Sequence, residues 1–176
     1  MRILGLCGSL RKQSRSLALL QATQILAAGR CDFTLFDGCG DLPLFNPDIE
    51  MNPPLAVVRL WQHIQDADVI VIASPEYAHG VTGVIKNTLD WLVGYSRFAY
   101  KAVAVLNPSH RAHHADEAIR EILTTMAARL IPGACLRIPA TGCSLSADEM
   151  ADSDEFSGLI CAALDAITVF YHQELG

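Results

Sequence analysis

Three basic side chains and three serines occur together in the segment GSLRKQSRS, residues 8–16, directly after the apolar run RILGLC. Where a strand runs into a helix, unpaired backbone N–H groups at the helix start attract anions. The hydroxyls of Ser9, Ser14 and Ser16 add hydrogen-bond donors. The forked guanidinium of Arg11 matches phosphate oxygens. The segment therefore predicts a binding site for a terminal phosphate group.

Several other phosphate and nucleophile motifs do not describe this segment. The P-loop ends in Gly-Lys-Ser/Thr, and the dinucleotide fingerprint needs a third glycine beyond Gly5 and Gly8. A C-x5-R phosphatase loop starting at Cys7 would require arginine where this chain has Gln13, so we interpret Cys7 as a core residue. The G-x-S-x-G pattern of serine hydrolases is absent. A serine-capped helix start with solvated cations remains an alternative for the segment taken alone.

A second segment of unusual composition, residues 74–91, reads SPEYAHGVTGVIKNTLDW and follows the apolar run DVIVIA. Pro75 stiffens the backbone where the strand ends. Tyr77 offers an aromatic surface, and Gly80 permits a ligand to approach the backbone closely. We expect a rigid loop with exposed N–H groups beside an aromatic ring, suited to the edge of a planar heterocycle. The alternative is an ordinary strand-to-helix turn, and we interpret Trp91 as a core side chain.

The elements around these two segments alternate between strand and helix. The predicted strands span residues 2–7, 31–36, 68–74, 101–107 and 134–139, and the predicted helices span 14–28, 54–66, 83–93, 113–130 and 154–173. Residues 37–53 form a Pro/Gly/Asn-rich loop, and residues 142–152 form a polar loop or a short helix. Such alternation predicts one α/β domain, residues 1–176, with helices on both faces of a parallel sheet.

Five strands in a chain of this length fit a flavodoxin-like three-layer sandwich with strand order 2-1-3-4-5. In that order the chain changes direction between strands 1 and 3, which leaves a crevice at their carboxyl ends where ligands bind. The segments 8–16 and 74–82 follow these two strands. We therefore expect them to lie side by side and to form one site.

Composition excludes several kinds of partner. The formal net charge is -6 and the sequence pI is about 5.4, so we expect neither nucleic acid nor an anionic membrane as a general partner. No apolar run reaches the length of a membrane span, and no leader is recognised, so we expect a cytoplasmic protein. The cysteines have no C-x-x-C spacing and are interpreted as reduced thiols; they are Cys7, Cys31, Cys39, Cys135, Cys143 and Cys161.

A group of histidines lies shortly before and within the predicted helix 113–130. His110 and His114 would share a helical face, which is a spacing that metal sites use. No neighbouring cysteine or adjacent carboxylate completes a ligand set with His113, although Asp116 is close, and we predict no metal site. His79 lies in the second segment, and its type and position do not assign it a role.

The two segments together resemble the NADPH-dependent FMN reductase family, flavodoxin-like flavoenzymes that include quinone, chromate and azo-dye reductases. The family pattern is G-S-x-R-x-x-S-x-N in the first segment, and P-E-Y-N followed by P-G-x-L-K-N-x-x-D-W in the second. This chain has GSLRKQSRS and PEYAHGVTGVIKNTLDW at these places. The stretch LPLFNPDIE in the long loop is also similar, and the order of elements agrees over nearly the whole chain.

The resemblance implies which residues bind FMN. In the family the first segment holds the FMN phosphate and the second lines the isoalloxazine. The corresponding residues are Ser9, Arg11, Ser14 and Ser16 for the phosphate and Pro75, Glu76, Tyr77 and Ala78 for the ring. Ser16 and Ala78 stand where the family has asparagine, and Thr82 stands where it has proline. Ser109 or His110 are candidates for contacts with the pyrimidine ring.

The resemblance also implies an activity and an assembly. NADPH, or alternatively NADH, would reduce bound FMN, which would pass electrons to a quinone, a flavin or a similar small acceptor. Because the flavin carries out this chemistry, no catalytic side chain is predicted. A homodimer or homotetramer is implied, with Arg97, Phe98 and Tyr100 as candidates near the interface. Two alternatives remain: a flavodoxin-like electron carrier, and an FMN-binding module without nicotinamide turnover.

Overall fold

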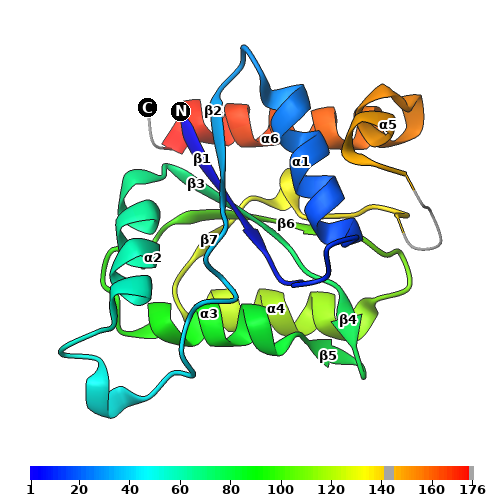
Figure 1. Ribbon diagram of the computed structural model, residues 1–176. Coiled ribbons are helices and arrows are strands. Elements are labelled where there is room, and N and C mark those ends of the chain that lie inside the picture. The colour runs from blue at the N-terminus through cyan, green and yellow to red at the C-terminus, as the bar shows by residue number, and fades with distance from the viewer. Residues whose placement is uncertain (141–144, 175–176) are drawn as a thin grey trace.

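A parallel β-sheet runs through the middle of the computed structural model, which describes residues 1–140 and 145–174 (Figure 1). The strands are β1 (Arg2–Cys7), β2 (Asp32–Phe36), β3 (Val69–Ala73), β4 (Glu76–Tyr77), β5 (Gly80–Val81), β6 (Ala102–Asn107), β7 (Arg129–Leu130) and β8 (Leu136–Arg137). The sheet order is β2-β1-β3-β6-β7, and β8 also pairs with β6. This confirms the predicted flavodoxin-like α/β fold and the predicted strand order 2-1-3-4-5, because β8 lies within the predicted fifth strand and pairs with β6 in parallel.

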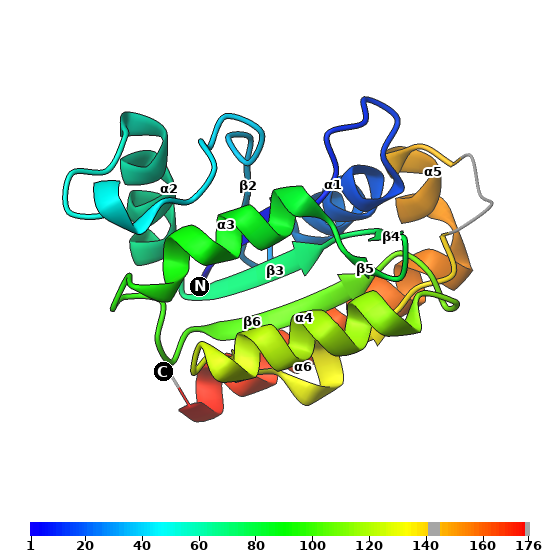
Figure 2. The ribbon, with the colours of Figure 1, turned by 90° about the horizontal axis from the view of Figure 1, so that it is seen from below.

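Helices cover both faces of this sheet (Figure 2). They are α1 (Arg15–Ala27), α2 (Leu55–Asp66), α3 (Gly83–Val93), α4 (His113–Thr125), α5 (Ala147–Asp152) and α6 (Asp154–Glu174). Two 3-10 turns, Pro47–Ile49 and Pro132–Ala134, interrupt the loops. The predicted helices 14–28, 54–66, 83–93 and 154–173 agree with α1, α2, α3 and α6 to within about a residue at each end.

Two hydrophobic cores form because successive residues of a strand point to opposite faces of the sheet. Every residue of β3 and of β6 is buried, as expected for central parallel strands. The first core includes Leu19, Leu20, Val69, Val71, Met150 and Ile160, from α1, β3, α5 and α6. The second core includes Leu4, Leu60, Ile70, Ile72, Ile85 and Leu123, from β1, α2, β3, α3 and α4. Trp91 is 1% exposed in the second core, which confirms its predicted role.

The C-terminal edge of the sheet differs from the prediction. Helix α4 ends at Thr125, not at residue 130, because Ala127 adopts a positive φ of 57° and Ala128 N–H bonds back to Leu123 O at 2.9 Å. The chain then turns into β7 beside β6. The predicted fifth strand, 134–139, is reduced to the two residues of β8, because the segment 132–134 forms a 3-10 turn that Pro132 starts.

One charged residue of α4 faces inward. The Asp116 side chain is 3% exposed and pairs with Arg120 at 3.2 Å and with Arg137 at 3.0 Å. Burial of a carboxylate is costly unless opposite charges compensate it. The two guanidinium groups do so here, and they tie α4 to β8.

The cysteines in the described residues carry no disulfide. Cys7, Cys31, Cys39, Cys135 and Cys161 are free thiols, and Cys143 lies outside the described residues. Burial raises the pKa of Cys7 and raises that of Cys39 to about 11, so these thiols stay protonated. In the described ranges, no helix combines the length and the hydropathy that crossing a bilayer requires.

Candidate functional site

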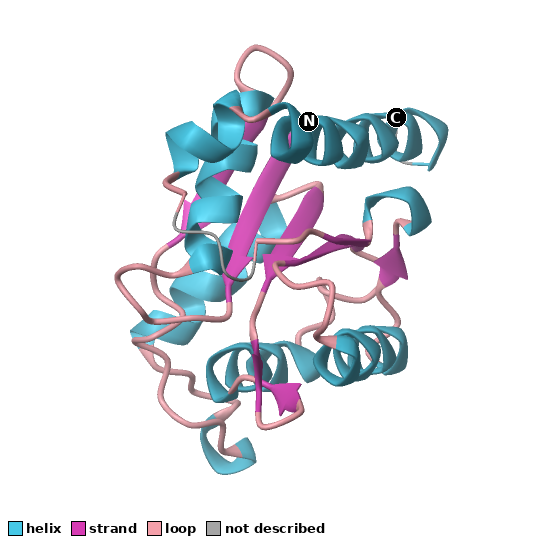
Figure 3. Cartoon of the chain, turned by 90° about the vertical axis from the view of Figure 1, so that its right-hand side faces the viewer, coloured by secondary structure: helices cyan, strands magenta, loops and turns pink. Residues whose placement is uncertain are grey.

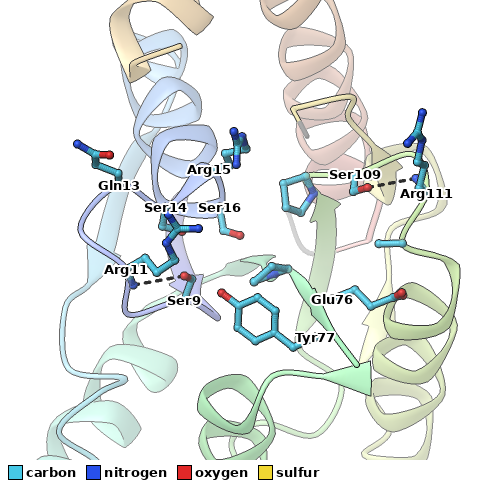
Figure 4. A pocket seen from close by; sticks show the side chains of 13 residues that line it. Ser9, Arg11, Gln13, Ser14, Arg15, Ser16, Glu76, Tyr77, Ser109 and Arg111 are labelled. Carbon is cyan, nitrogen blue, oxygen red and sulfur yellow. Dashed lines mark hydrogen bonds between the residues drawn. The ribbon is translucent and has the colours of Figure 1, made fainter. Parts of the chain in front are cut away.

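A cleft of about 280 Å³ opens at the carboxyl ends of the central strands (Figure 4). Its lining consists of Ser9, Arg11, Gln13, Ser14, Arg15, Ser16, Pro75, Glu76, Tyr77, Pro108, Ser109, Arg111 and Ala112. The structure thus brings together both predicted segments and the loop between β6 and α4, which holds the candidates Ser109 and His110. Of the eight residues predicted to bind FMN, Ala78 is the one that does not line the cleft.

Hydrogen bonds and close packing hold the first two segments side by side. Gly8 N–H donates to Ala73 O at 2.8 Å, and Thr82 Oγ1 donates to Gly8 O at 2.7 Å. A Cβ at Gly8 would lie 2.2 Å from Ser74 Oγ and 3.0 Å from Ser74 Cα, so only glycine fits this approach. The predicted side-by-side placement of the two segments is confirmed.

Two serines of the first segment keep an O–H that can donate to a ligand. Ser14 caps α1, where its Oγ accepts the Leu17 N–H at 3.3 Å, and Ser9 Oγ accepts the Arg11 N–H at 3.4 Å. Because both hydroxyl oxygens serve as acceptors, their protons remain available. Both side chains lie at the wall of the cleft, where an anion would meet them.

Ser16 provides the strongest sign that this wall is built for a ligand. It is 1% exposed, and within the described part of the chain its Oγ has no hydrogen-bond partner. A buried polar group without a partner costs free energy, so its presence calls for an explanation. Figure 4 shows the hydroxyl directed toward the cleft beside Ser14. An oxyanion in the cleft would satisfy it.

Positive charge also lines the cleft. Arg11 is exposed and takes part in no ion pair with another described residue. Gln13 and Arg15 line the same wall, although they were not among the predicted site residues. The signal that would have found them is their position within the same nine-residue segment.

The second segment is a two-stranded hairpin instead of the predicted loop, and it lies apart from the main sheet (Figure 3). Strands β4 and β5 pair in antiparallel fashion, with Tyr77 opposite Gly80. The turn residues Ala78 and His79 have φ of 50° and 58°. Two successive positive φ values match the type I′ turn that closes tight hairpins. The turn places Ala78 at the tip of the hairpin, outside the cleft lining.

Glu76 fixes this hairpin to helix α4. Its Oε2 accepts the Ala115 N–H at 2.8 Å, and its Oε1 lies 3.3 Å from His79 Nδ1. The hydrogen bond from Ala115 is the main cause that lowers the pKa of Glu76, and the charges of His79 and His114 add to it. The His79 and His114 rings meet edge to face at 4.7 Å. The carboxylate therefore serves to hold the hairpin, while Tyr77 remains 52% exposed beside the cleft.

The third wall comes from the loop that follows β6. Asn107 is 3% exposed; its Nδ2 donates to Ala112 O at 2.8 Å and its Oδ1 accepts the Ser109 N–H at 3.0 Å. Of the two candidates for ring contacts, Ser109 lines the cleft and His110 does not. His110 also precedes the first residue of α4, so it does not share a helical face with His114.

The residues present fit the group that the resemblance implies. FMN combines a monoester phosphate with a flat heterocycle. The first wall offers serine hydroxyls and guanidinium groups, and the second offers an exposed tyrosine on a stiff hairpin. Cys7, by contrast, packs against the first core with its pKa raised by burial, which does not suit a phosphatase nucleophile.

Comparison with known proteins agrees with this geometry. A family model described as NADPH-dependent FMN reductase matches residues 1–141. The NAD(P)H-dependent FMN reductase of Pseudomonas aeruginosa is 38% identical over 91 residues, which are 51% of this chain and 49% of that protein. The matched part thus spans about half the length of that relative. A subunit of the NADH:(hydroxy)cinnamate reductase of Vibrio ruber is 32% identical over 139 residues, 75% of this chain and 68% of that protein.

A solved structure extends the similarity to the whole fold. The flavoenzyme NAD(P)H:(acceptor) oxidoreductase FerB of Paracoccus denitrificans superposes with a TM-score of 0.74 and 29% sequence identity. The superposition covers 96% of this chain and 97% of that one.

Proposed function

The chain belongs to the NADPH-dependent FMN reductase family, and on that premise we propose that it is an NAD(P)H-dependent FMN oxidoreductase. The observation that carries the proposal is the cleft itself. One wall holds serine hydroxyls and arginines, and the adjoining wall holds an exposed tyrosine, both at the carboxyl edge of β1 and β3. FMN would supply the transfer of hydride and electrons when bound.

The protein's residues would bind and orient the cofactor. The hydroxyls of Ser9, Ser14 and Ser16 would donate to the phosphate, and Arg11 would pair with its charge. The backbone of Pro75 and Glu76 and the ring of Tyr77 would line the isoalloxazine, and Ala78 would contribute only through its position in the turn. We assign no side chain as a catalytic acid or base.

Membership of the family supports a proposal for the reductant and the acceptor. We propose NADPH as the donor, with NADH as the alternative, and a quinone, a flavin or a similar small molecule as the acceptor. Both substrates would use the same exposed side of the cofactor in turn. The Pseudomonas aeruginosa relative is described as using NAD(P)H, which supports a nicotinamide donor.

Assembly and location are proposals of the same kind. We propose a homodimer or homotetramer in the cytoplasm. Tyr100, which is 72% exposed with a φ of 64°, and the exposed Arg97 remain candidates for the subunit interface. Phe98 is a core side chain, 1% exposed, so it does not offer a contact surface. The free thiols in the described residues support a reducing compartment.

A direct test uses the purified chain. We expect it to bind FMN, with a yellow colour, and expect NADPH to bleach that colour under anaerobic conditions. Binding without bleaching would support the electron carrier or the binding module instead. Arg11→Ala should weaken FMN binding about tenfold or more, because a charge-assisted bond is lost. Lys12→Ala removes a neighbouring charge that does not line the cleft and should not change it. A colourless chain that ignores added FMN would overturn the proposal.

A further inference from the structure

One cation of the cleft stands apart from the phosphate-binding wall. Arg111 lies on the loop between β6 and α4, whereas Arg11 and Arg15 lie on the wall formed by the first segment. Figure 4 shows Arg111 across the cleft from these two arginines, with Tyr77 between the walls. One phosphate group held by the first segment therefore does not account for Arg111.

The backbone that carries Arg111 is fixed from both sides. Its own N–H donates to Ser109 Oγ at 3.1 Å, and the neighbouring Ala112 O accepts Asn107 Nδ2 at 2.8 Å. Asn107 is buried at the end of β6, so the loop is anchored to the sheet. The guanidinium itself is exposed and pairs with no carboxylate of the described residues. A fixed backbone thus presents a free cation at the rim of the cleft.

The cleft lacks an acidic partner for this cation. Glu76 is the only carboxylate among the described lining residues, and it is already bonded to the Ala115 N–H and close to His79. The chain as a whole carries a net charge of -6, so the positive charge of the cleft is opposite in sign to that of the protein. This local excess indicates a second anionic ligand besides the FMN phosphate.

We propose that Arg111 binds the diphosphate of the nicotinamide coenzyme; this rests on the proposed function. The nicotinamide must reach the flavin ring near Tyr77, and the diphosphate follows it after one ribose. That short spacing brings the diphosphate to the rim, where Arg111 lies. Quinone and flavin acceptors have no common anionic group at this spacing, whereas NADPH and NADH share the diphosphate. Arg111 is then a binding residue for the reductant and not for FMN.

The test measures binding separately from turnover. The FMN-loaded wild type and Arg111→Gln are titrated with NADP⁺ and with NAD⁺ by calorimetry, and FMN affinity is measured on the cofactor-free forms. We expect both nicotinamides to bind about tenfold more weakly to Arg111→Gln, with FMN affinity unchanged. Arg111→Lys should recover part of the lost nicotinamide affinity. Lys12→Gln is the matched control, because it removes one positive charge from a residue outside the cleft lining.

Each other result would contradict the assignment. Weaker FMN binding by Arg111→Gln would place the guanidinium on the cofactor. A loss confined to NADP⁺ would place it on the 2′-phosphate. Unchanged nicotinamide binding with a raised KM for a carboxylate-bearing quinone, but not for a neutral one, would assign it to an anionic acceptor. Failure of the wild type to bind FMN would instead refute the proposed function itself.

Discussion

At the scale of single residues, we expect Ser16→Ala to have different effects on stability and on FMN affinity. Ser16→Ala removes a buried donor that has no partner among residues 1–140 and 145–174, so the free energy of unfolding without FMN should stay the same or rise by up to about 1 kcal/mol. FMN affinity should fall about tenfold, because a bond to the charged phosphate is lost. Chemical denaturation and fluorescence titration measure the two effects.

A threonine of the same helix provides the control. Thr23 is buried, its Oγ1 donates to Leu19 O at 2.8 Å, and it does not line the cleft. Thr23→Val should lower stability slightly and leave FMN affinity unchanged. If Ser16→Ala behaved like Thr23→Val, the hydroxyl would be an ordinary helix residue and not a phosphate ligand.

Residue type and order predicted that Ser9, Arg11, Ser14 and Ser16 line one wall of the cleft, but not their contacts. Ser9, Arg11, Ser14 and Ser16 were selected because they fall in one segment after a strand. That the Ser16 hydroxyl is buried with no partner in the described part of the chain depends on how α1 packs, which no local sequence pattern reveals. Arg111 was missed although its neighbours Ser109 and His110 were candidates, because no motif in this loop marks an arginine as a ligand-binding residue.

At the scale of elements, the strained turn of the hairpin predicts that glycine stabilises the protein. Ala78 has a φ of 50°, a conformation that costs an alanine about 1 kcal/mol or more. Ala78→Gly should therefore raise the free energy of unfolding by roughly 0.5–1 kcal/mol. Ala28→Gly is the control, since Ala28 is exposed and has a φ of -56°. Glycine at this position should lower the free energy of unfolding. Denaturation in urea measures the free energy of unfolding of both variants. A loss of stability in Ala78→Gly as well as in Ala28→Gly would contradict the argument from the positive φ of Ala78.

The contact between the hairpin and α4 predicts a pH dependence. The pKa of Glu76 is lowered in the folded protein, mainly by the Ala115 N–H, so its charged form stabilises the fold. That contribution is present above the unfolded value of 4.5 and is lost as the pH falls through the lowered folded value. Glu76→Gln should be less stable than wild type at pH 7, and the difference should shrink in acid. A difference that is constant with pH would exclude the carboxylate charge as its cause.

Elements with strong local signals were predicted well, and those fixed by tertiary contacts were not. The fully buried β3 and β6 and the serine-capped α1 carry their signals in the sequence. The end of α4 depends on the positive φ of Ala127, and alanine is not a residue from which a positive φ would be predicted. The hairpin β4–β5 was missed because an Ala-His turn lacks the asparagine and glycine that usually mark type I′ turns.

At the scale of the whole molecule, strand order does the most to build the site. Both cores share the central strands, and the order β2-β1-β3-β6 places the three cleft segments at one edge of the sheet. The alternation of strands and helices predicted the parallel sheet, and five strands in a chain of this length predicted its order. The three-walled cleft follows from it, although its third wall carried no recognisable motif.

Because the cleft joins three segments anchored to one sheet, FMN should stabilise the whole domain and not the loops alone. At about 100 times its dissociation constant, FMN should add about 2.7 kcal/mol to the free energy of unfolding, which is roughly 5–10 °C in Tm for a chain of this size. Tryptophan fluorescence, which reports on the second core through Trp61 and Trp91, and far-ultraviolet circular dichroism should give coincident transitions with and without FMN. Ser16→Ala should lose part of the shift at the same FMN concentration. A Tm that FMN does not move, or two separated transitions, would show that the cleft is not coupled to the fold in this way.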